Sequence, residues 1–379
     1  MRGALIAGTN GKGSTAAMLA AILRHAGHTV GTMPSPHLGS YTERIQVDGI
    51  PITEAEFAMA VERLRPRLED IGADLGPPTE FEILTTLAIS HLAQHCDRLV
   101  IEVGMGGRLD ATNVLDFGLA VITNVALDHQ QYLGDTVARI AAEKAGIVKP
   151  GNTVITGAEG EALAIVERAA ADAGAHLWRL GQELRLQTRW LGWEGSEIDV
   201  TGPAFAHRDL RVPLLGSHQA ANAALAVAAA HALGEAPDGL AEARWPGRLE
   251  LVGDNPPVLL DGGHNPAALA RLAEDVPRLA GARPVTVVFG MMADKDLAAG
   301  LAELRHLRPA GVVFTAAQSP RAARPEDLAG IWGGGEVALP ALAAAERGIE
   351  LAGPGGLVLV CGSLYVVGEV RPALVGRRR

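Results

Sequence analysis

The sequence predicts an α/β protein of two domains, in which helices pack against parallel sheets. Short apolar runs alternate along the chain with alanine-rich segments of good helix-forming residues, which is the pattern of successive βα units. Of the 379 residues, 48% are hydrophobic and only 4% are aromatic, a balance that favours this class over an all-β fold. The length is sufficient for two domains with separate cores.

Five buried strands are predicted in the first half of the chain, each an apolar run followed by polar or glycine residues. They cover residues 4–7, 28–32, 98–104, 119–124 and 153–156. Helical periodicity predicts helices over residues 16–27, 53–70, 79–95 and 135–147, and Thr53 with Glu56 resembles a capping box. Because the ligand-binding groups of a parallel sheet lie at the carboxyl ends of its strands, the residues that follow these runs are candidates for one site.

The pattern changes after residue 184. Period-2 alternation over residues 184–213 predicts a small antiparallel appendage, and a helix is predicted over 219–233. The passage Trp245-Pro246-Gly247-Arg248 is typical of an interdomain linker. A second βα series follows it, with strands predicted over 258–261, 285–290, 311–315 and 357–361. We therefore expect an N-terminal domain over residues 1–245 and a C-terminal domain over residues 249–379.

The candidate nucleotide site is the glycine-rich run of residues 8–15, between the first strand and the first helix. Glycines let the backbone approach a ligand closely, and the helix that follows presents a partly positive N-terminus. Lys12 adds a positive charge, while Ser14 or Thr15 offers a hydroxyl to Mg²⁺. These features together predict a cradle for phosphate groups.

Two patterns compete for this loop. The strict P-loop has Ser or Thr directly after Lys, whereas Gly13 follows Lys12 here, and Ile6 stands where that pattern has its first glycine. The same letters fit a dinucleotide fingerprint, which needs an acidic residue after the second strand. Residues 33–37 contain none, and a lysine lies inside the loop, so a nucleoside triphosphate is favoured over a dinucleotide.

Polar residues after other strands are further candidates. Glu102 ends a predicted buried strand, where a cation such as Mg²⁺ would offset the cost of burying a carboxylate; an ion pair with an arginine such as Arg108 is the alternative. His129 follows the next strand. His264 follows a C-terminal strand, where turn chemistry alone is an equal alternative. Lys144 lies in a predicted helix, where spacing alone predicts an ordinary solvated residue.

Several function classes are disfavoured. The net charge is −10 and no basic tract precedes the last three residues, which argues against nucleic acid and anionic membranes as partners. The longest apolar stretch, residues 223–233, is too short to span a bilayer, and no signal peptide precedes the first strand. The two cysteines, Cys96 and Cys361, suggest neither a disulfide framework nor a zinc site. We expect a cytoplasmic monomer without hydrolase motifs such as Gly-x-Ser-x-Gly.

Motifs spread over nearly the whole chain resemble the folylpolyglutamate synthase/dihydrofolate synthase branch of the Mur ligase superfamily. They cover residues 8–15, 35–38, 102–113, 127–129, 143–151, 246–250, 261–266, 293–296 and 362–365. The resemblance implies a P-loop-type parallel-sheet domain with the small antiparallel appendage, followed by a smaller Rossmann-like α/β domain, with ATP between them. It implies that ATP phosphorylates a carboxylate of dihydropteroate or folate and that the amine of L-glutamate then attacks the acyl phosphate.

The resemblance also implies roles for individual residues. Lys12, Lys144, His129 and Glu102 would be catalytic. Ser35, Glu102 and His129 would hold two Mg²⁺ ions, and Lys144, carbamylated by CO₂, would be an anionic ligand on the metal side. ATP would be contacted by Gly11, Lys12, Gly13, Ser14, Asn222, Arg248 and Asp261, with His264 as a further member of this set. The pterin substrate would be contacted by Thr79, Leu109, Asp110 and Ala111.

Three functions remain as alternatives at this point. The first is a dual dihydrofolate and folylpolyglutamate synthase. The second is a cell-wall ligase of the parent superfamily that acts on a UDP-linked peptide. The third is a nucleotide-binding protein without ligase activity, since members of the family usually carry a helical segment with pterin contacts ahead of the first strand, and this sequence begins at the strand.

Overall fold

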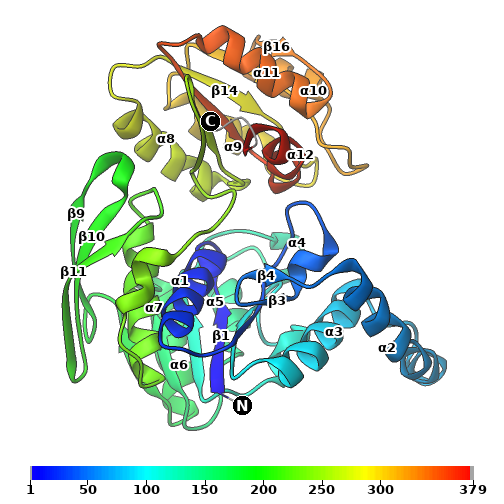
Figure 1. The fold of residues 1–379 in the computed structure, drawn as a ribbon, viewed down its shortest axis with the longest axis vertical. Helices are drawn as coiled ribbons and strands as arrows, with labels where there is room; N and C mark the ends of the chain where they lie inside the picture. Colours follow the sequence, from blue (N-terminus) through cyan, green and yellow to red (C-terminus); the bar gives the residue numbers. More distant parts are fainter. Residues whose placement is uncertain (1, 376–379) are drawn as a thin grey trace. The chain divides into compact units, whose positions relative to one another are not determined.

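The chain folds into two α/β units, each with its own sheet and its own core (Figure 1). The computed structural model describes residues 2–375, apart from the side chains of residues 72–75. The N-terminal unit consists of Met1–Arg189, Glu197–Pro213 and Gln219–Arg244, and the C-terminal unit of Trp190–Ser196, Leu214–His218 and Trp245–Arg379. Two short segments from the middle of the chain therefore belong to the C-terminal unit.

The N-terminal unit is built on a sheet with the strand order β4-β3-β2-β5-β1-β6-β7-β8. Its strands are β1 (Arg2–Ala7), β2 (Val30–Met33), β3 (Gln46–Val47), β4 (Ile50–Pro51), β5 (Arg98–Glu102), β6 (Leu119–Ile122), β7 (Thr153–Thr156) and β8 (His176–Arg179). The pairs from β2 to β8 are parallel, and β3 and β4 add an antiparallel edge. The predicted strands are confirmed with ends shifted by up to two residues, whereas β3, β4 and β8 were not predicted.

Helices follow these strands as a βα pattern requires. They are α1 (Lys12–His25), α2 (Glu54–Leu75), α3 (Glu80–His95), α4 (Gln130–Leu133), α5 (Val137–Ala145), α6 (Gly160–Asp172) and α7 (Gln219–Ala232), with short 3₁₀ turns η1 (Tyr41–Arg44), η2 (Ala111–Val114) and η4 (Asp238–Glu242). The capping box at the start of α2 is confirmed, since the Glu56 carboxylate accepts from both the backbone N–H and the hydroxyl of Thr53. The first helix begins at Lys12 rather than at residue 16, so the lysine lies in its first turn.

The predicted antiparallel appendage is a three-stranded sheet with the order β11-β10-β9. It consists of β9 (Arg185–Trp190), β10 (Ser196–Gly202) and β11 (Phe205–Val212). Only Pro203 and Ala204 join β10 to β11. Because parallel neighbours need a much longer crossover, this connection makes the two strands antiparallel.

The C-terminal unit has a sheet with the order β12-β13-β17-β14-β15-β16. Its strands are β12 (Glu250–Asp254), β13 (Pro257–Leu260), β14 (Val285–Phe289), β15 (Gly311–Phe314), β16 (Glu336–Val337) and β17 (Leu357–Cys361), and its helices are α8 (Pro266–Ala280), α9 (Leu297–Arg305), α10 (Pro325–Trp332), α11 (Ala341–Ala352) and α12 (Leu364–Val375), with a 3₁₀ turn, η3 (Gly192–Glu194). All pairs are parallel except β12 with β13. The second βα series is thereby confirmed.

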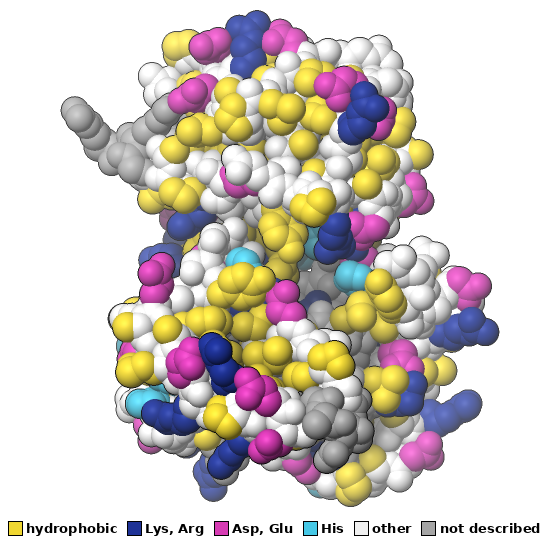
Figure 2. Space-filling model, turned by 90° about the vertical axis from the view of Figure 1, so that its right-hand side faces the viewer, with side chains coloured by type: hydrophobic (Ala, Val, Ile, Leu, Met, Phe, Trp, Pro, Cys, Tyr) yellow, Lys and Arg dark blue, Asp and Glu magenta, His cyan; other side chains and the backbone are white. Residues whose placement is uncertain are grey.

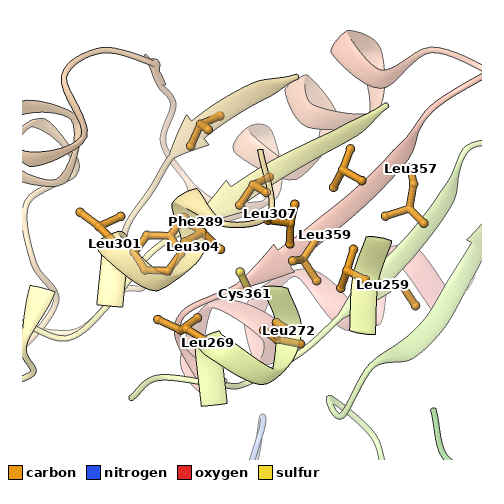
Figure 3. Close-up of a cluster of buried hydrophobic side chains, with 14 of the residues drawn as sticks. Leu259, Leu269, Leu272, Phe289, Leu301, Leu304, Leu307, Leu357, Leu359 and Cys361 are labelled. Carbon is orange, nitrogen blue, oxygen red and sulfur yellow. The ribbon is translucent and has the colours of Figure 1, made fainter. Parts of the chain in front are cut away.

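The core of the C-terminal unit shows why its strands read as unbroken apolar runs. Figure 3 shows leucines of α8 and α9, such as Leu269 and Leu304, among Phe289, Leu359 and Cys361 of the central strands. Strands covered on both faces bury every side chain, so alternation disappears. Cys361 and Cys96 are both free thiols. Among the described residues, no helix combines the length and the apolar character needed to cross a membrane.

Candidate active site

The glycine-rich loop connects β1 to α1 at the carboxyl edge of the sheet, between the ends of β5 and β6. Gly11 has φ 84°, and a Cβ placed on it would lie 2.3 Å from Oδ1 of Asn222 on α7. A Cβ on Gly8 would lie 1.9 Å from the hydroxyl oxygen of Thr123. Gly11 is needed because α1 and α7 lie side by side (Figure 1), and Gly8 because the loop passes against the residue after β6.

Two residues that follow β6 hold this loop, and we did not predict either of them. The Thr123 hydroxyl donates to the carbonyl of Asn10 at 2.7 Å. The Asn124 side chain accepts from the N–H of Asn10 at 3.0 Å and donates to its carbonyl at 2.9 Å. The rule that singled out Glu102, namely polar residues at the carboxyl end of a strand, also applies to this pair and could have found them.

Two lysines converge on one carbonyl of the loop. The Lys12 ammonium donates to the carbonyl oxygens of Gly8 at 3.0 Å and Thr9 at 3.2 Å. The Lys144 ammonium, from the last turn of α5, donates to the same Gly8 oxygen at 2.9 Å. Burial, and next the positive charge of Lys12, lower the pKa of Lys144 to about 7. Lys144 is therefore a buried amine of the site and not the solvated helix residue that its spacing predicts.

The first turn of α1 continues the loop with buried residues. Gly13, Ser14 and Thr15 are all buried. Within the part of the chain that the structure describes, the buried hydroxyl of Thr15 has no hydrogen-bond partner. A buried polar atom without a partner is costly, so this hydroxyl fits a site whose ligand would satisfy it.

Glu102 and Ser35, two of the predicted metal ligands, are in direct contact. Glu102 is only 4% exposed at the end of β5, and its carboxylate accepts from the backbone N–H of Ser35 at 3.2 Å. The Ser35 hydroxyl oxygen accepts from the Arg44 guanidinium at 2.8 Å. His129 begins α4 with φ 52°, and its Nε2 lies 3.9 Å from a carboxylate oxygen of Asp128.

The donor chemistry of this set suits a hard cation. A carboxylate and a hydroxyl offer oxygen ligands, which Mg²⁺ prefers. No group of three or more His, Cys, Asp or Glu side chains in the described residues is arranged to hold a metal ion. The predicted set contains only one Glu and one His, so it depends on the hydroxyl of Ser35 and on a modified Lys144 for its remaining ligands.

The residues predicted to contact the pterin lie at the N-terminal ends of α3 and η2, two elements that touch each other. Thr79 is the N-cap of α3, where its hydroxyl accepts from the N–H of Glu82. The Asp110 carboxylate is turned into its own loop and accepts from the N–H groups of Met105 at 2.9 Å and Thr112 at 3.0 Å. Leu109 is 78% exposed, which leaves its side chain available to a ligand.

The remaining predicted ATP contacts form a cluster of their own in the C-terminal unit. Asp261 follows β13, and its two carboxylate oxygens accept from the N–H groups of Leu249 at 2.8 Å and Gly263 at 2.7 Å. Burial raises the pKa of Asp261 against the opposing effect of Arg248. The His264 ring nitrogen Nδ1 lies 2.9 Å from the Gly262 carbonyl, so it donates to that oxygen.

Comparison with known proteins identifies the family. Models of the Mur ligase middle domain and of the Mur ligase glutamate ligase domain match residues 6–230 and 247–364. A dihydrofolate synthase/folylpolyglutamate synthase of Bacillus subtilis is 35% identical, over 97% of this chain and 89% of the relative. This chain belongs to the dihydrofolate synthase/folylpolyglutamate synthase family.

Solved structures of the dihydrofolate synthase/folylpolyglutamate synthase family share the fold. A Mycobacterium tuberculosis folylpolyglutamate synthase complexed with ADP and AMPPCP has a TM-score of 0.92 at 33% identity, over 99% of this chain and 91% of its own. E. coli FolC in complex with DHPP and ADP has a TM-score of 0.89 at 34% identity, over 100% of this chain and 90% of its own. The predicted two-part α/β fold is thus confirmed.

Proposed function

We propose that this chain is an ATP-dependent ligase that adds L-glutamate to dihydropteroate, to the glutamate tail of folate, or to both. The observation that carries the proposal is the convergence of Lys12 and Lys144 on the Gly8 carbonyl, inside a loop whose glycines and helix N-terminus suit phosphate. The relatives with this function match nearly the whole chain, and one solved relative holds ADP together with DHPP.

The reaction would proceed in two balanced steps. A carboxylate oxygen of the acceptor attacks the γ-phosphorus of ATP, the bond to ADP breaks, and an acyl phosphate forms. The amine of L-glutamate then attacks the acyl carbon, an amide forms, and phosphate leaves with one proton released. A carboxylate is a poor electrophile until phosphate becomes its leaving group, and the phosphoryl transfer needs mainly positioning and charge neutralisation.

The residues of the chain have separate roles in this proposal. The phosphates would be bound by the backbone N–H groups of the loop and by Gly11, Gly13 and Ser14. Lys12 would neutralise the charge of the phosphates. Ser35, Glu102 and His129 would hold two Mg²⁺ ions, which when bound would neutralise charge on the transferring phosphoryl group. Further ATP contacts are proposed for Asn222, Arg248, Asp261 and His264, and acceptor contacts for Thr79, Leu109, Asp110 and Ala111. All of these residues come from one chain, and we propose that it acts as a monomer.

Lys144 would act as a carbamate. Its pKa of about 7 leaves much of the amine neutral at physiological pH, and only a neutral amine attacks CO₂. The Lys144 nitrogen bonds to the carbon of CO₂ and loses a proton, which leaves an anion beside the Lys12 ammonium. The chain has four lysines, Lys12, Lys144, Lys149 and Lys295, so ¹³C NMR with labelled bicarbonate can test this directly. One carbamate signal is expected, and it should be missing in Lys144→Met but present in Lys295→Met.

The function is tested by measuring ADP release from ATP with Mg²⁺, L-glutamate and dihydropteroate. Release is expected only when both co-substrates are present, with a product one glutamate heavier by mass spectrometry. Turnover with a UDP-linked peptide instead would identify a cell-wall ligase. ATP binding without turnover on any acceptor would identify a nucleotide-binding protein and overturn the proposal.

On the face shown in Figure 2, Lys and Arg are interspersed with Asp and Glu, which suits small-molecule substrates better than nucleic acid.

A further inference from the structure

Two consecutive residues in the last turn of α5 reach two different loops. Lys144 donates to the Gly8 carbonyl of the phosphate loop at 2.9 Å. Glu143 instead accepts from Arg108, in the loop of residues 104–114, through the guanidinium Nε at 3.1 Å and Nη2 at 2.7 Å. We call this second segment the acceptor loop, because it carries the proposed acceptor contacts Leu109, Asp110 and Ala111.

Further hydrogen bonds, made by backbone and side-chain groups, hold the acceptor loop against the same turn and the residues after it. The N–H of Arg108 donates to the Glu143 carbonyl at 2.8 Å. The Asn113 side chain donates to the carbonyls of Arg108 and Gly146, each at 3.1 Å. The Lys149 ammonium donates to the carbonyl of Asn113 at 2.7 Å and also to that of Leu115. The loop is therefore attached to α5 and the residues after it at several points.

Two glycines allow this close approach. A Cβ on Gly107 would lie 2.8 Å from the Glu143 carbonyl oxygen, and a Cβ on Gly146 would lie 2.4 Å from the Cβ of Arg108. Any side chain at either position would push the loop away from the helix. The contact between backbones thus brings Arg108 to Glu143. The ion pair, in which two guanidinium N–H groups donate to one carboxylate oxygen, then fixes the direction of the loop.

We propose that Arg108 and Glu143 are positioning residues for the ligation, which fix the acceptor loop relative to the phosphate loop through the last turn of α5. The inference rests on the proposed function, because it concerns the distance between acceptor and ATP. Transfer requires the reacting atoms to lie about 3–3.5 Å apart, and a misplacement of about 1 Å can cost on the order of a hundredfold in rate. The Arg108 side chain is 56% exposed, so the pair contributes little to stability and its value lies in placement.

The test compares Arg108→Met and Glu143→Gln with the wild type. We expect kcat/KM for the acceptor to fall by about tenfold in each variant, while KM for ATP stays within about twofold. The double variant should be no worse than either single variant, because both remove the same contact. Arg108→Lys keeps the charge but loses the planar fork, and should recover only part of the activity.

A matched control is available in the C-terminal unit. Arg347 pairs with both oxygens of Glu336, at 2.7 and 3.0 Å, and with Glu350 at 3.0 Å, and it is also partly exposed. Arg347→Met therefore removes a surface arginine with at least as many ionic contacts, far from either loop in sequence. This control should leave all kinetic constants and the melting temperature nearly unchanged. A purely structural role for Arg108 would lower the melting temperature and the amount of active enzyme. It would not change KM for the acceptor relative to KM for ATP.

The outcomes separate the two proposals. A wild type that releases no ADP in the presence of acceptor and glutamate overturns the proposed function and this inference with it. An active wild type whose Arg108→Met and Glu143→Gln variants match the Arg347→Met control overturns the inference alone. A KM for ATP that rises as much as the KM for the acceptor would also overturn it. If Arg108→Met fails to fold, Glu143→Gln and Arg108→Lys decide by the same criterion.

Discussion

The two units each bury a charged side chain near proposed site residues, and the two groups are held in opposite ways. Asp261, in the C-terminal unit, has each carboxylate oxygen bound to a backbone N–H. Lys144, in the N-terminal unit, donates to a carbonyl that it shares with a second ammonium group, that of Lys12. Burial raises the pKa of Asp261 and lowers that of Lys144. Burial is therefore common to both, and the partners differ.

The difference indicates which buried charge is structural and which is reactive. The amides of Leu249 and Gly263 use both oxygens of Asp261, so this carboxylate pins the linker after Arg248 to the end of β13. Burial, and next the like charge of Lys12, lower the pKa of Lys144, so its amine is available for chemistry near neutral pH. We expect substitution of Asp261, which is also a proposed ATP contact, to lower stability, and substitution of Lys144 to affect mainly activity.

The largest effect is expected for Lys144→Met. Removal of one group that stabilises charge in an active site costs on the order of 10²–10³-fold in rate, and we expect a loss of glutamate-dependent ADP release in this range. Lys295→Met is the control, since it removes a lysine of the C-terminal unit that is not among the proposed site residues. An unchanged rate for Lys144→Met would contradict the assignment of Lys144 as the reactive one of the two buried charges.

Asp261→Asn tests the other half of the comparison. One oxygen becomes an NH₂ group that faces a backbone N–H, which leaves a buried donor unpaired and lowers the free energy of unfolding by about 1–3 kcal/mol. Urea denaturation followed by tryptophan fluorescence measures this, because four of the five tryptophans, Trp190, Trp193, Trp245 and Trp332, belong to the C-terminal unit. A stability equal to that of the wild type would show that the two amides do not depend on the carboxylate.

The pH dependence of stability sharpens the comparison further. Between about pH 7 and 10.5 the unfolded chain keeps a proton on Lys144 that the folded protein has lost, so the free energy of unfolding rises with pH in this window. The contribution is at most about 1.4 kcal/mol per pH unit. Lys144→Met should remove this slope in buffer freed of CO₂. Parallel pH profiles for wild type and variant would contradict the lowered pKa.

The smallest effect is expected for Thr79→Ala, at an exposed helix cap. Loss of the capping hydroxyl lowers stability by about 1 kcal/mol, measured by thermal unfolding. If Thr79 also contacts the acceptor, KM for dihydropteroate rises in the same variant. Thr53→Ala, which removes the equivalent cap of α2, is the control and should lower stability alone.

Local sequence signals predicted the loop and the strands that carry the site. The environment of its reactive groups depends on contacts between residues far apart in the sequence. The glycines of residues 8–13 and the βα periodicity are properties of short segments. They therefore predicted the phosphate loop and the succession of strands and helices along the chain. The environment of Lys144 depends on the meeting of residues 8, 12 and 144, which no local pattern encodes. The strands β3 and β4 have two residues each, too few for a visible period.

Arg108 illustrates the same limit. An ion pair with Arg108 was the alternative to a cation at Glu102, and the Arg108 guanidinium instead pairs with Glu143, 35 residues away. The glycines at 107 and 146 make this meeting possible, but their close contacts are visible only in three dimensions. Sequence motifs contained all of these residues and did not show which of them touch.

The adjacency of Glu143 and Lys144 has a consequence for the evolution and engineering of this domain. Successive helical residues differ in direction by about 100°, so inserting or deleting one residue in this turn would rotate one of the two contacts away from its loop. Chimaeras between relatives should therefore be joined outside α5, for example in the turn at residues 181–182, where a change of length disturbs neither contact.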